Sequence, residues 1–199
     1  MEPFYRLEAR QRIALAREAH EDGTPLMARW ADMLPDFGDR WEHRAALAAV
    51  WLADAASVAD LGCGTMTLER HLRRDQAYHP VDIAARDERT VVRNLNDGRD
   101  LARLPRADAC TLLGVLEYSY VPDALFAALR ATYARAVLSF NVRADDDAFE
   151  QRLEHGWVNH FTYGELIAMF ARHRLAARYA HLFEGRRREY LFDLRRVDG

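Results

Sequence analysis

The stretch SVADLGCGTM, residues 57–66, places two glycines directly after a short apolar run. The run 58–61 is typical of a buried β-strand. Gly62 and Gly64 permit unusual backbone dihedral angles and let a ligand approach the main chain closely. A threonine just beyond them can cap a helix whose first N–H groups point into the same crevice. The pattern predicts a strand, a tight turn and a helix, with a ligand site at the turn.

Length and composition are those of one folded unit. The chain has 199 residues, of which 50% are hydrophobic and 30% charged, and a net charge of −3. This weak acidity argues against a dedicated nucleic-acid binder. All 28 basic residues other than histidine are arginine, which we interpret as compositional bias. Cys63 and Cys110 lie in apolar contexts that favour buried thiols over disulfides, and no pattern indicates a zinc site.

Seven short apolar runs alternate with amphipathic segments after residue 57, which is typical of an α/β fold. The expected strands are 58–61, 78–83, 90–95, 109–116, 136–140, 176–183 and 189–195. The connection between the last two is too short for a helical crossover, so they should form an antiparallel hairpin. The link 84–89 is also short, and a helix there should be vestigial or absent. We therefore predict a Rossmann-like, mostly parallel seven-stranded sheet with helices on both faces.

Helical patterns dominate the first part of the chain. The expected helices are 4–20, 25–34 and 41–53, followed within the α/β region by 67–74, 122–135 and 163–173. We predict two units: an N-terminal helical lid or cap, residues 1–53, and a ligand-binding α/β domain, residues 54–199. The N-terminal residues lack the apolar core of a signal peptide, and no apolar run approaches the roughly 18 residues of a membrane span. A cytoplasmic protein is expected.

A second polar position supports a nucleoside-like ligand. Asp82 ends the next expected strand, where a carboxylate can accept hydrogen bonds from ribose hydroxyls. An NAD-dependent oxidoreductase is disfavoured, because Thr67 stands where the dinucleotide fingerprint needs a third glycine. A glycine turn alone is as often a plain tight turn as a ligand site. The combination with Asp82 and the terminal hairpin is more specific.

Together these segments resemble the class I S-adenosylmethionine-dependent methyltransferases. The matching pieces are ADLGCGTM (59–66), PVDI (80–83), ADACTLLGVLEY (107–118) and WVNHFTYGEL (157–166), spread over the α/β region. The resemblance implies that the glycine loop wraps the methionine part of S-adenosyl-L-methionine. It also implies that the acid of the second strand binds the ribose, and that the segment after the third strand flanks the adenine. The cofactor-binding residues implied are Asp60, Gly62, Cys63, Gly64, Asp82, Asn94, Leu95 and Glu117.

Two positions depart from the family's pattern. Met66 occupies the place of a frequent third glycine, and Asn94 stands near the place of a common acid beside the adenine. Met66 should make that side of the loop tighter. These departures keep a second function open, a non-catalytic binding or scaffold protein that retains the fold.

Methyl transfer needs alignment and exclusion of water more than a fixed catalytic set. A hydroxyl acceptor would benefit from a general base, and His160 is the candidate, although capping or packing of the next helix is the more common role. Tyr118 is a second catalytic candidate and equally a packing residue. Asn141 follows the fifth strand and could contact an acceptor. We expect a methyltransferase acting on a small-molecule or sugar-like acceptor, with no nucleic-acid, membrane or metal partner; the oligomeric state is open.

Overall fold

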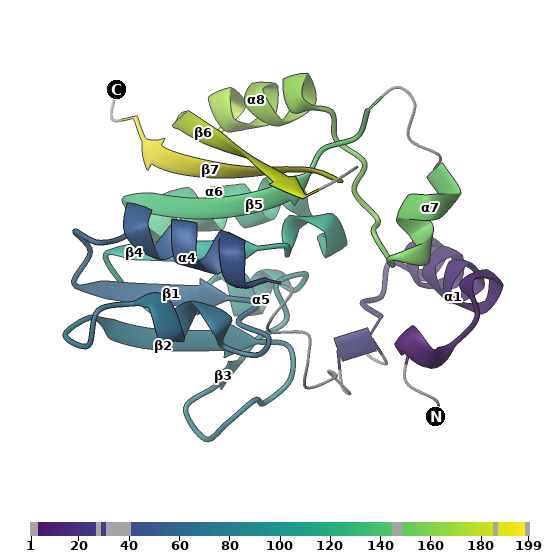
Figure 1. Ribbon diagram of the computed structural model, residues 1–199, viewed down its shortest axis with the longest axis horizontal. Coiled ribbons are helices and arrows are strands. Elements are labelled where there is room, and N and C mark those ends of the chain that lie inside the picture. Colours follow the sequence, from purple (N-terminus) through teal and green to yellow (C-terminus); the bar gives the residue numbers. More distant parts are fainter. Residues whose placement is uncertain (1–3, 27–28, 31–40, 145–148, 185–186, 198–199) are drawn as a thin grey trace.

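One sheet organises the α/β part of the chain. Its strands are β1 (Ser57–Leu61), β2 (Ala77–Asp82), β3 (Val91–Val92), β4 (Ala109–Leu113), β5 (Arg135–Asn141), β6 (Leu175–Glu184) and β7 (Arg187–Arg196). In the computed structural model, which describes residues 4–26, 29–30, 41–144, 149–184 and 187–197, these seven strands lie in the order β3-β2-β1-β4-β5-β7-β6 (Figure 1). Strand β7 runs antiparallel to both β5 and β6, and the other neighbouring pairs are parallel. The predicted fold class, including the terminal hairpin, is confirmed.

The strand order reverses beside β1. From β1 the chain moves outward through β2 and β3, and then returns to place β4 on the other side of β1. Adjacent loops therefore leave in opposite directions and open a crevice beyond the carboxyl ends of β1 and β4. Ligands of doubly wound sheets bind at such a switch point. The glycine turn that follows Leu61 lies at this crevice.

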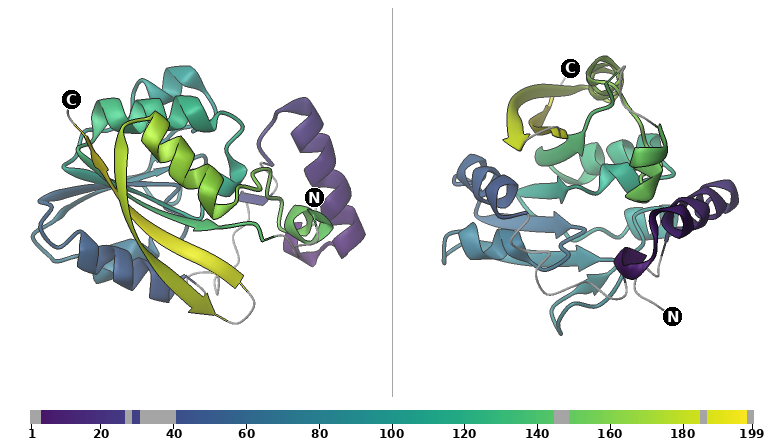
Figure 2. Two further views of the ribbon diagram at one scale, coloured as in Figure 1. Left: turned by 90° about the horizontal axis from the view of Figure 1, so that it is seen from above. Right: turned by 45° about the vertical axis from the view of Figure 1, so that its right-hand side comes forward.

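Apolar side chains alternate along the central strands and supply two cores. Val58 faces the core formed with α4 (Glu42–Trp51) and the 3₁₀ helix η2 (Thr67–His71), whereas Ala59 and Leu61 face the opposite core. That opposite core includes α5 (Gly98–Leu101), α6 (Pro122–Thr132) and α8 (Tyr163–Arg172). Figure 2 shows α4 on one side of the sheet and α6 and α8 on the other. The predicted helices on both faces are confirmed.

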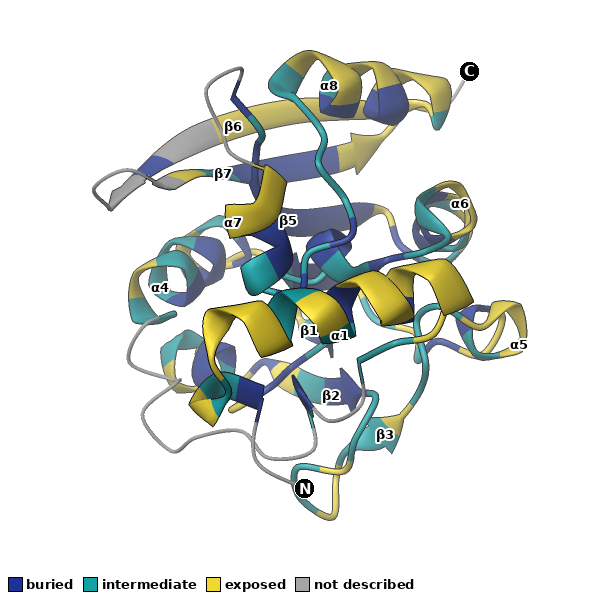
Figure 3. Ribbon diagram, turned by 90° about the vertical axis from the view of Figure 1, so that its right-hand side faces the viewer, coloured by how far each residue is buried: buried dark blue, intermediate teal, exposed yellow. Residues whose placement is uncertain are grey.

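The N-terminal segment lies beyond the carboxyl ends of the strands. It comprises the 3₁₀ helix η1 (Phe4–Arg6) and α1 (Ala9–Asp22), and α1 lies beside α7 (Phe149–Glu154) (Figure 3). Arg12 and Arg17 of α1 form ion pairs with Glu154 and Glu150 of α7. Helix α4 instead packs on the sheet. The division at residue 53 stays a prediction, and the expected helix 25–34 falls largely outside the described residues.

Several element boundaries differ from those expected. The segment 67–74 forms the short η2 because Leu72 is extended and packs in the core beneath α4. Strand β4 ends at Leu113, since Gly114 adopts a φ of +73° and turns the chain into the 3₁₀ helix η3 (Leu116–Tyr118). Strand β3 spans two residues, Val91–Val92. Between β2 and β3 the described residues form no helix, as the short link predicted. Helices α5 and α7 were not predicted.

Candidate cofactor and acceptor cavities

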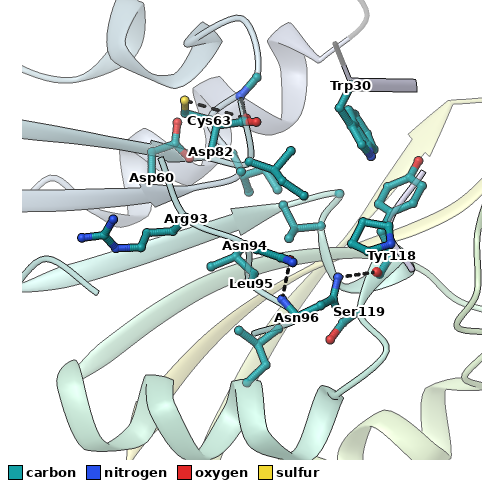
Figure 4. Close-up of a pocket in the computed structure, with 18 of the residues that line it drawn as sticks. Trp30, Asp60, Cys63, Asp82, Arg93, Asn94, Leu95, Asn96, Tyr118 and Ser119 are labelled. Carbon is teal, nitrogen blue, oxygen red and sulfur yellow. Dashed lines mark hydrogen bonds between the residues drawn. The ribbon is translucent and has the colours of Figure 1, made fainter. Parts of the chain in front are cut away.

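A first cavity opens at the switch point of the sheet. It encloses about 1070 Å³ between protein atoms, part of it continuous with solvent. Asp60, Cys63 and Asp82 lie toward one end of it, and Trp30 and Tyr118 toward the other (Figure 4). Seven of the eight residues predicted to bind a cofactor line it: Asp60, Gly62, Cys63, Gly64, Asp82, Asn94 and Leu95.

The glycine turn has backbone dihedral angles that residues other than glycine adopt only with strain. Gly62 has a φ of +79°, and its N–H and that of Cys63 both donate to the carbonyl of Val81 on β2. A Cβ atom added to Gly62 would lie 2.4 Å from Cγ2 of Val115. The turn after β1 thus packs directly against the segment after β4. This close packing requires glycine at position 62.

Asp82 fastens the second glycine of the turn to β2. Its Oδ2 accepts the N–H of Gly64 at 2.8 Å, and its Oδ1 accepts from Nη2 of Arg86 at 3.0 Å. Arg86 in turn donates to the carbonyl of Trp30 at 2.7 Å, which connects the N-terminal segment to the same carboxylate. Asp82 is 5% exposed. The carboxylate therefore both shapes the turn and lines the cavity beside it.

Met66 does not obstruct the cavity. Its φ is +55°, the left-handed conformation that a glycine would adopt at this position. The side chain is directed to Arg89, whose Nη2 lies 3.6 Å from the methionine sulfur. Among the described residues that line the first cavity, Met66 is not included. The expected tightening of the loop by this thioether is therefore not seen on the cavity side.

Asp60 is a buried carboxyl held by two hydroxyls. Its Oδ1 accepts from Thr111 at 2.6 Å and its Oδ2 from Tyr78 at 2.7 Å. Burial raises the pKa of Asp60 from 3.8 to about 6, although both hydrogen bonds oppose this change. Since both oxygens are engaged by neighbouring strands, Asp60 braces β1 between β2 and β4 at the base of the cavity.

We expect Asp60→Asn to stabilise the protein near about pH 7.5 and to change its stability little near about pH 4. The folded protein holds the Asp60 proton more tightly than the unfolded chain does, because its pKa is raised. The wild type therefore loses stability as the pH rises between about 4 and 6, by up to about 3 kcal/mol. Asparagine carries no charge and, like a protonated carboxyl, has one acceptor and one donor, so one hydroxyl donates to it and the other accepts from it. Urea denaturation at both pH values measures the difference; an equal change at both would contradict it.

The segment after β3 closes the side of the first cavity. Asn94 accepts the N–H of Asn96 through its side-chain oxygen at 3.0 Å. The amide of Asn96 donates to the carbonyl of Tyr118 at 3.3 Å and accepts the N–H of Tyr120 at 2.6 Å. Asn96 thus joins the loops after β3 and β4. Asn96 was not assigned to the site from the sequence.

A second cavity adjoins the first at Tyr118 and Trp30, which line both. It encloses about 1170 Å³ between protein atoms, again partly open to solvent. The residues that define it for the argument below are Arg29, Trp30, Glu117, Tyr118, Asn141 and Trp157. Its walls come from η1, α1 and residues 29–30, from the start of α4, from η3 and the end of β5, and from β6 and β7. A molecule bound here would lie next to one bound in the first cavity.

Glu117 lines the second cavity and is not among the described residues that line the first. Its Oε1 accepts both the backbone and side-chain N–H groups of Asn141, each at 3.0 Å. The side chain is 1% exposed, and burial raises its pKa. Its Oε2 is buried and makes no hydrogen bond within the described part of the chain. The geometry therefore gives no support to the prediction that Glu117 contacts the cofactor.

Tyr118 stands between the two cavities. Its hydroxyl accepts from Nη2 of Arg29 and, at 3.0 Å, from Nε1 of Trp157. The ring of Trp30 meets it edge to face, with centroids 4.8 Å apart. Burial raises the pKa of Tyr118, so the phenol stays protonated at neutral pH. Its hydroxyl is suited to orienting a bound molecule by donating a hydrogen bond. The catalytic role of Tyr118 stays a prediction.

His160 lies apart from both cavities. It is not among the described residues that line either of them. Its Nδ1 accepts from Nε of Arg152 at 3.0 Å, and its ring lies 4.5 Å from that of Phe149. Burial and the nearby Arg152 lower its pKa to about 4, which keeps the ring neutral. Its role as a general base stays a prediction that this placement does not favour.

No group of three or more His, Cys, Asp and Glu side chains among the described residues could hold a metal ion. None of the helices formed by these residues has the length and apolar character needed to cross a bilayer.

Comparison with known proteins identifies the fold. No known family and no curated protein matches the sequence. Among solved structures, magnesium protoporphyrin IX methyltransferase from Synechocystis PCC 6803, with S-adenosylhomocysteine bound, is 15% identical, with a TM-score of 0.61 over 92% of this chain and 99% of that one. A 1,6-didemethyltoxoflavin-N1-methyltransferase from Burkholderia thailandensis is 17% identical, with a TM-score of 0.60 over 96% and 92% of the two chains. The pyocyanin biosynthetic protein PhzM is 19% identical, with a TM-score of 0.60 over 98% and 71%. Strand order and these likenesses together show that the chain has the fold of the class I S-adenosylmethionine-dependent methyltransferases.

Proposed function

We propose that the protein transfers a methyl group from S-adenosyl-L-methionine to a small-molecule acceptor. The observation that carries the proposal is the pair of adjoining cavities at the switch point of the sheet. The first presents a glycine turn and a carboxylate, and the second is aromatic and polar. Solved structures of this fold contain S-adenosylmethionine or S-adenosylhomocysteine, and one contains the small molecule 1,6-didemethyltoxoflavin.

The residues of the first cavity fit this cofactor chemically. Gly62 and Gly64 leave room for a ligand against the main chain. Oδ1 of Asp82 already accepts from Ala84 and Arg86, whereas Oδ2, which accepts the Gly64 N–H, can accept a further hydrogen bond from a ribose hydroxyl. Leu95 offers an apolar surface for a base, and Asn94 a side-chain amide. We propose Asp82 for the ribose and the 94–95 segment for the adenine.

When bound, the cofactor supplies a methyl group on a positively charged sulfur that leaves readily. The protein's part is then to align the acceptor with that methyl and to keep water out. Trp30 and Tyr118 border both cavities and so lie where the two molecules would meet. Arg29 and Trp157 both donate hydrogen bonds to the hydroxyl of Tyr118, which positions its ring in the wall between the two cavities.

Calorimetric titration with S-adenosylhomocysteine tests the proposal. We expect one site per chain, with a dissociation constant in roughly the micromolar range, and a higher melting temperature in its presence. NADH is the control ligand and should give no heat, because the third glycine of its fingerprint is replaced by Thr67. Absence of heat and of thermal protection with S-adenosylhomocysteine would overturn the proposal. Binding without turnover on any of a panel of acceptors would favour the non-catalytic alternative.

A further inference from the structure

Trp30 is held at its main chain by an arginine from a distant part of the sequence. Nη1 of Arg86, which lies on the link between β2 and β3, donates to the carbonyl of Trp30 at 2.7 Å. The Trp30 ring lines both cavities and meets the ring of Tyr118 edge to face. Arg86 is not among the described residues that line either cavity. It therefore holds part of the wall between the cavities from outside them.

The same guanidinium forms an ion pair with Asp82. Its Nη2 donates to Oδ1 of Asp82 at 3.0 Å, and the side chains of Arg86 and Asp82 are 11% and 7% exposed. A buried pair of this kind keeps its geometry, because separating it would leave two uncompensated charges. The planar fork of arginine can bind two oxygens at once through its two terminal nitrogens. Asp82 and Trp30 lie toward opposite ends of the first cavity, and Arg86 connects them (Figure 4).

The link between β2 and β3 is folded so that Arg86 reaches this carboxylate. The N–H groups of Arg86 and Asp87 both donate to Oγ1 of Thr90 at 3.1 Å, and this hydroxyl donates to Oδ1 of Asp87 at 3.1 Å. These hydrogen bonds close the link into a compact turn. Arg86 is thereby brought close to Asp82, four residues earlier in the chain.

Other contacts hold the neighbourhood of Trp30 through side chains. Nη2 of Arg29 donates to the hydroxyl of Tyr118, and the rings of Trp30 and Tyr118 are in contact. Within the described part of the chain, the bond from Arg86 is the one hydrogen bond that joins the main chain of residues 29–30 to another element. Loss of Arg86 should therefore release the main chain at Trp30 while the contacts of Arg29 remain.

We propose that Arg86 is a positioning residue, which holds the Trp30 ring in the wall between the two cavities through its ion pair with Asp82. This deepens the proposed function, on which it rests for the statement that the ring lies beside the transferred methyl group. Arg86 then supports the ribose site and the boundary of the acceptor cavity together. The anchoring of Trp30 is a property of the ligand-free protein, so it is measurable whether or not the cofactor binds.

Fluorine NMR on the full chain labelled with 5-fluorotryptophan measures the anchoring. The chain has four tryptophans, and Trp30→Ala identifies the Trp30 resonance by its loss. In Arg86→Gln we expect this resonance to shift toward its position in the urea-unfolded protein and to sharpen, because the residue loses its main-chain anchor. The resonance of Trp51, at the end of α4, should keep its position. Arg89→Gln is the matched control and should leave the Trp30 resonance unchanged, since Arg89 belongs to the same link but pairs with Glu69 on the surface.

A double-variant cycle in S-adenosylhomocysteine affinity tests the connection to the cofactor site. We expect Arg86→Gln to weaken binding about tenfold in the wild type but about threefold or less in the Trp30→Ala protein, because part of its effect is transmitted through the ring. A residue that acted only by compensating the charge of Asp82 would weaken binding by the same factor in both proteins. Arg86→Lys keeps a positive charge beside Asp82 but lacks the fork, so the Trp30 resonance should still shift.

An unchanged Trp30 resonance in Arg86→Gln overturns the proposal, as do equal effects of this change on affinity with and without the Trp30 ring. A shift of the same size in Arg89→Gln overturns it too, because loss of any positive charge from the link would then suffice. Should Arg86→Gln fail to fold, Arg86→Lys takes its place in both measurements with the same outcomes. If the wild type does not bind S-adenosylhomocysteine, the proposed function fails, and the fluorine spectra alone decide whether Arg86 anchors Trp30.

Discussion

Replacing Asp82 with alanine should weaken binding of S-adenosylhomocysteine at least about a hundredfold. Under the proposed function Oδ2 of this carboxylate accepts a charge-assisted hydrogen bond from the ribose, worth about 1.5–3 kcal/mol. The same change releases the N–H of Gly64 and the guanidinium of Arg86, so the turn loses its anchor as well. Calorimetric titration gives the affinity. Circular dichroism and the melting temperature establish that the variant is folded.

Asp75→Ala is the matched control for this experiment. Asp75 is an exposed carboxylate on the connection to β2, where it pairs with Arg73 at 3.0 Å. Its loss should leave the affinity within about twofold of the wild type, because surface ion pairs contribute little. An Asp82→Ala protein that is folded and binds as tightly as Asp75→Ala would refute the ribose assignment.

Gly62→Ala should destabilise the protein by about 2–4 kcal/mol. Part of this cost comes from the φ of +79°, which a residue with a Cβ adopts unfavourably, and the rest from a contact at 2.4 Å with Val115. Gly23 separates the two causes. Its φ is +62° and an added Cβ would meet nothing within 4 Å, so Gly23→Ala should cost only about 1 kcal/mol. Urea denaturation at a single pH measures both free energies of unfolding.

A double variant tests the steric part directly. Val115→Ala removes the methyl group that the new Cβ would strike, so adding it to Gly62→Ala should recover about 1 kcal/mol or more relative to additivity. The left-handed backbone cost should remain. A Gly62→Ala protein no less stable than Gly23→Ala, or strictly additive effects at positions 62 and 115, would show that the turn is not packed against the segment after β4 as described.

Topology was predictable because each signal behind it is local. Short apolar runs mark the strands, and the last two runs are separated by too few residues for a crossover, which forces antiparallel pairing. Element lengths were less predictable. Leu72 leaves η2 early because its side chain packs under α4, and Gly114 stops β4 by a dihedral angle that its sequence neighbours do not reveal. Both depend on packing between segments distant in sequence.

The same distinction holds for the site. Asp82 and the glycine turn could be placed together from sequence, since the carboxyl ends of parallel neighbours meet at one edge. Arg29 could not be placed at the site from sequence. All 28 lysine or arginine positions of the chain are arginine, so a single arginine carries no local signal. Glu117 was expected beside the cofactor, yet it lines the neighbouring cavity together with Asn141. The loop after β4 lies at the cavities as expected, but the direction in which each of its side chains points could not be predicted from the sequence.

The side chain of Tyr118 is part of the wall of both cavities. A molecule that shifts this ring from one side changes the shape offered on the other, and equilibrium requires the two effects to be equal in size. If a molecule in the second cavity strengthens binding of the nucleoside in the first, the nucleoside strengthens binding of that molecule by the same factor. The affinity of one cavity for its ligand, measured while the other cavity is empty, therefore gives only one side of this thermodynamic cycle.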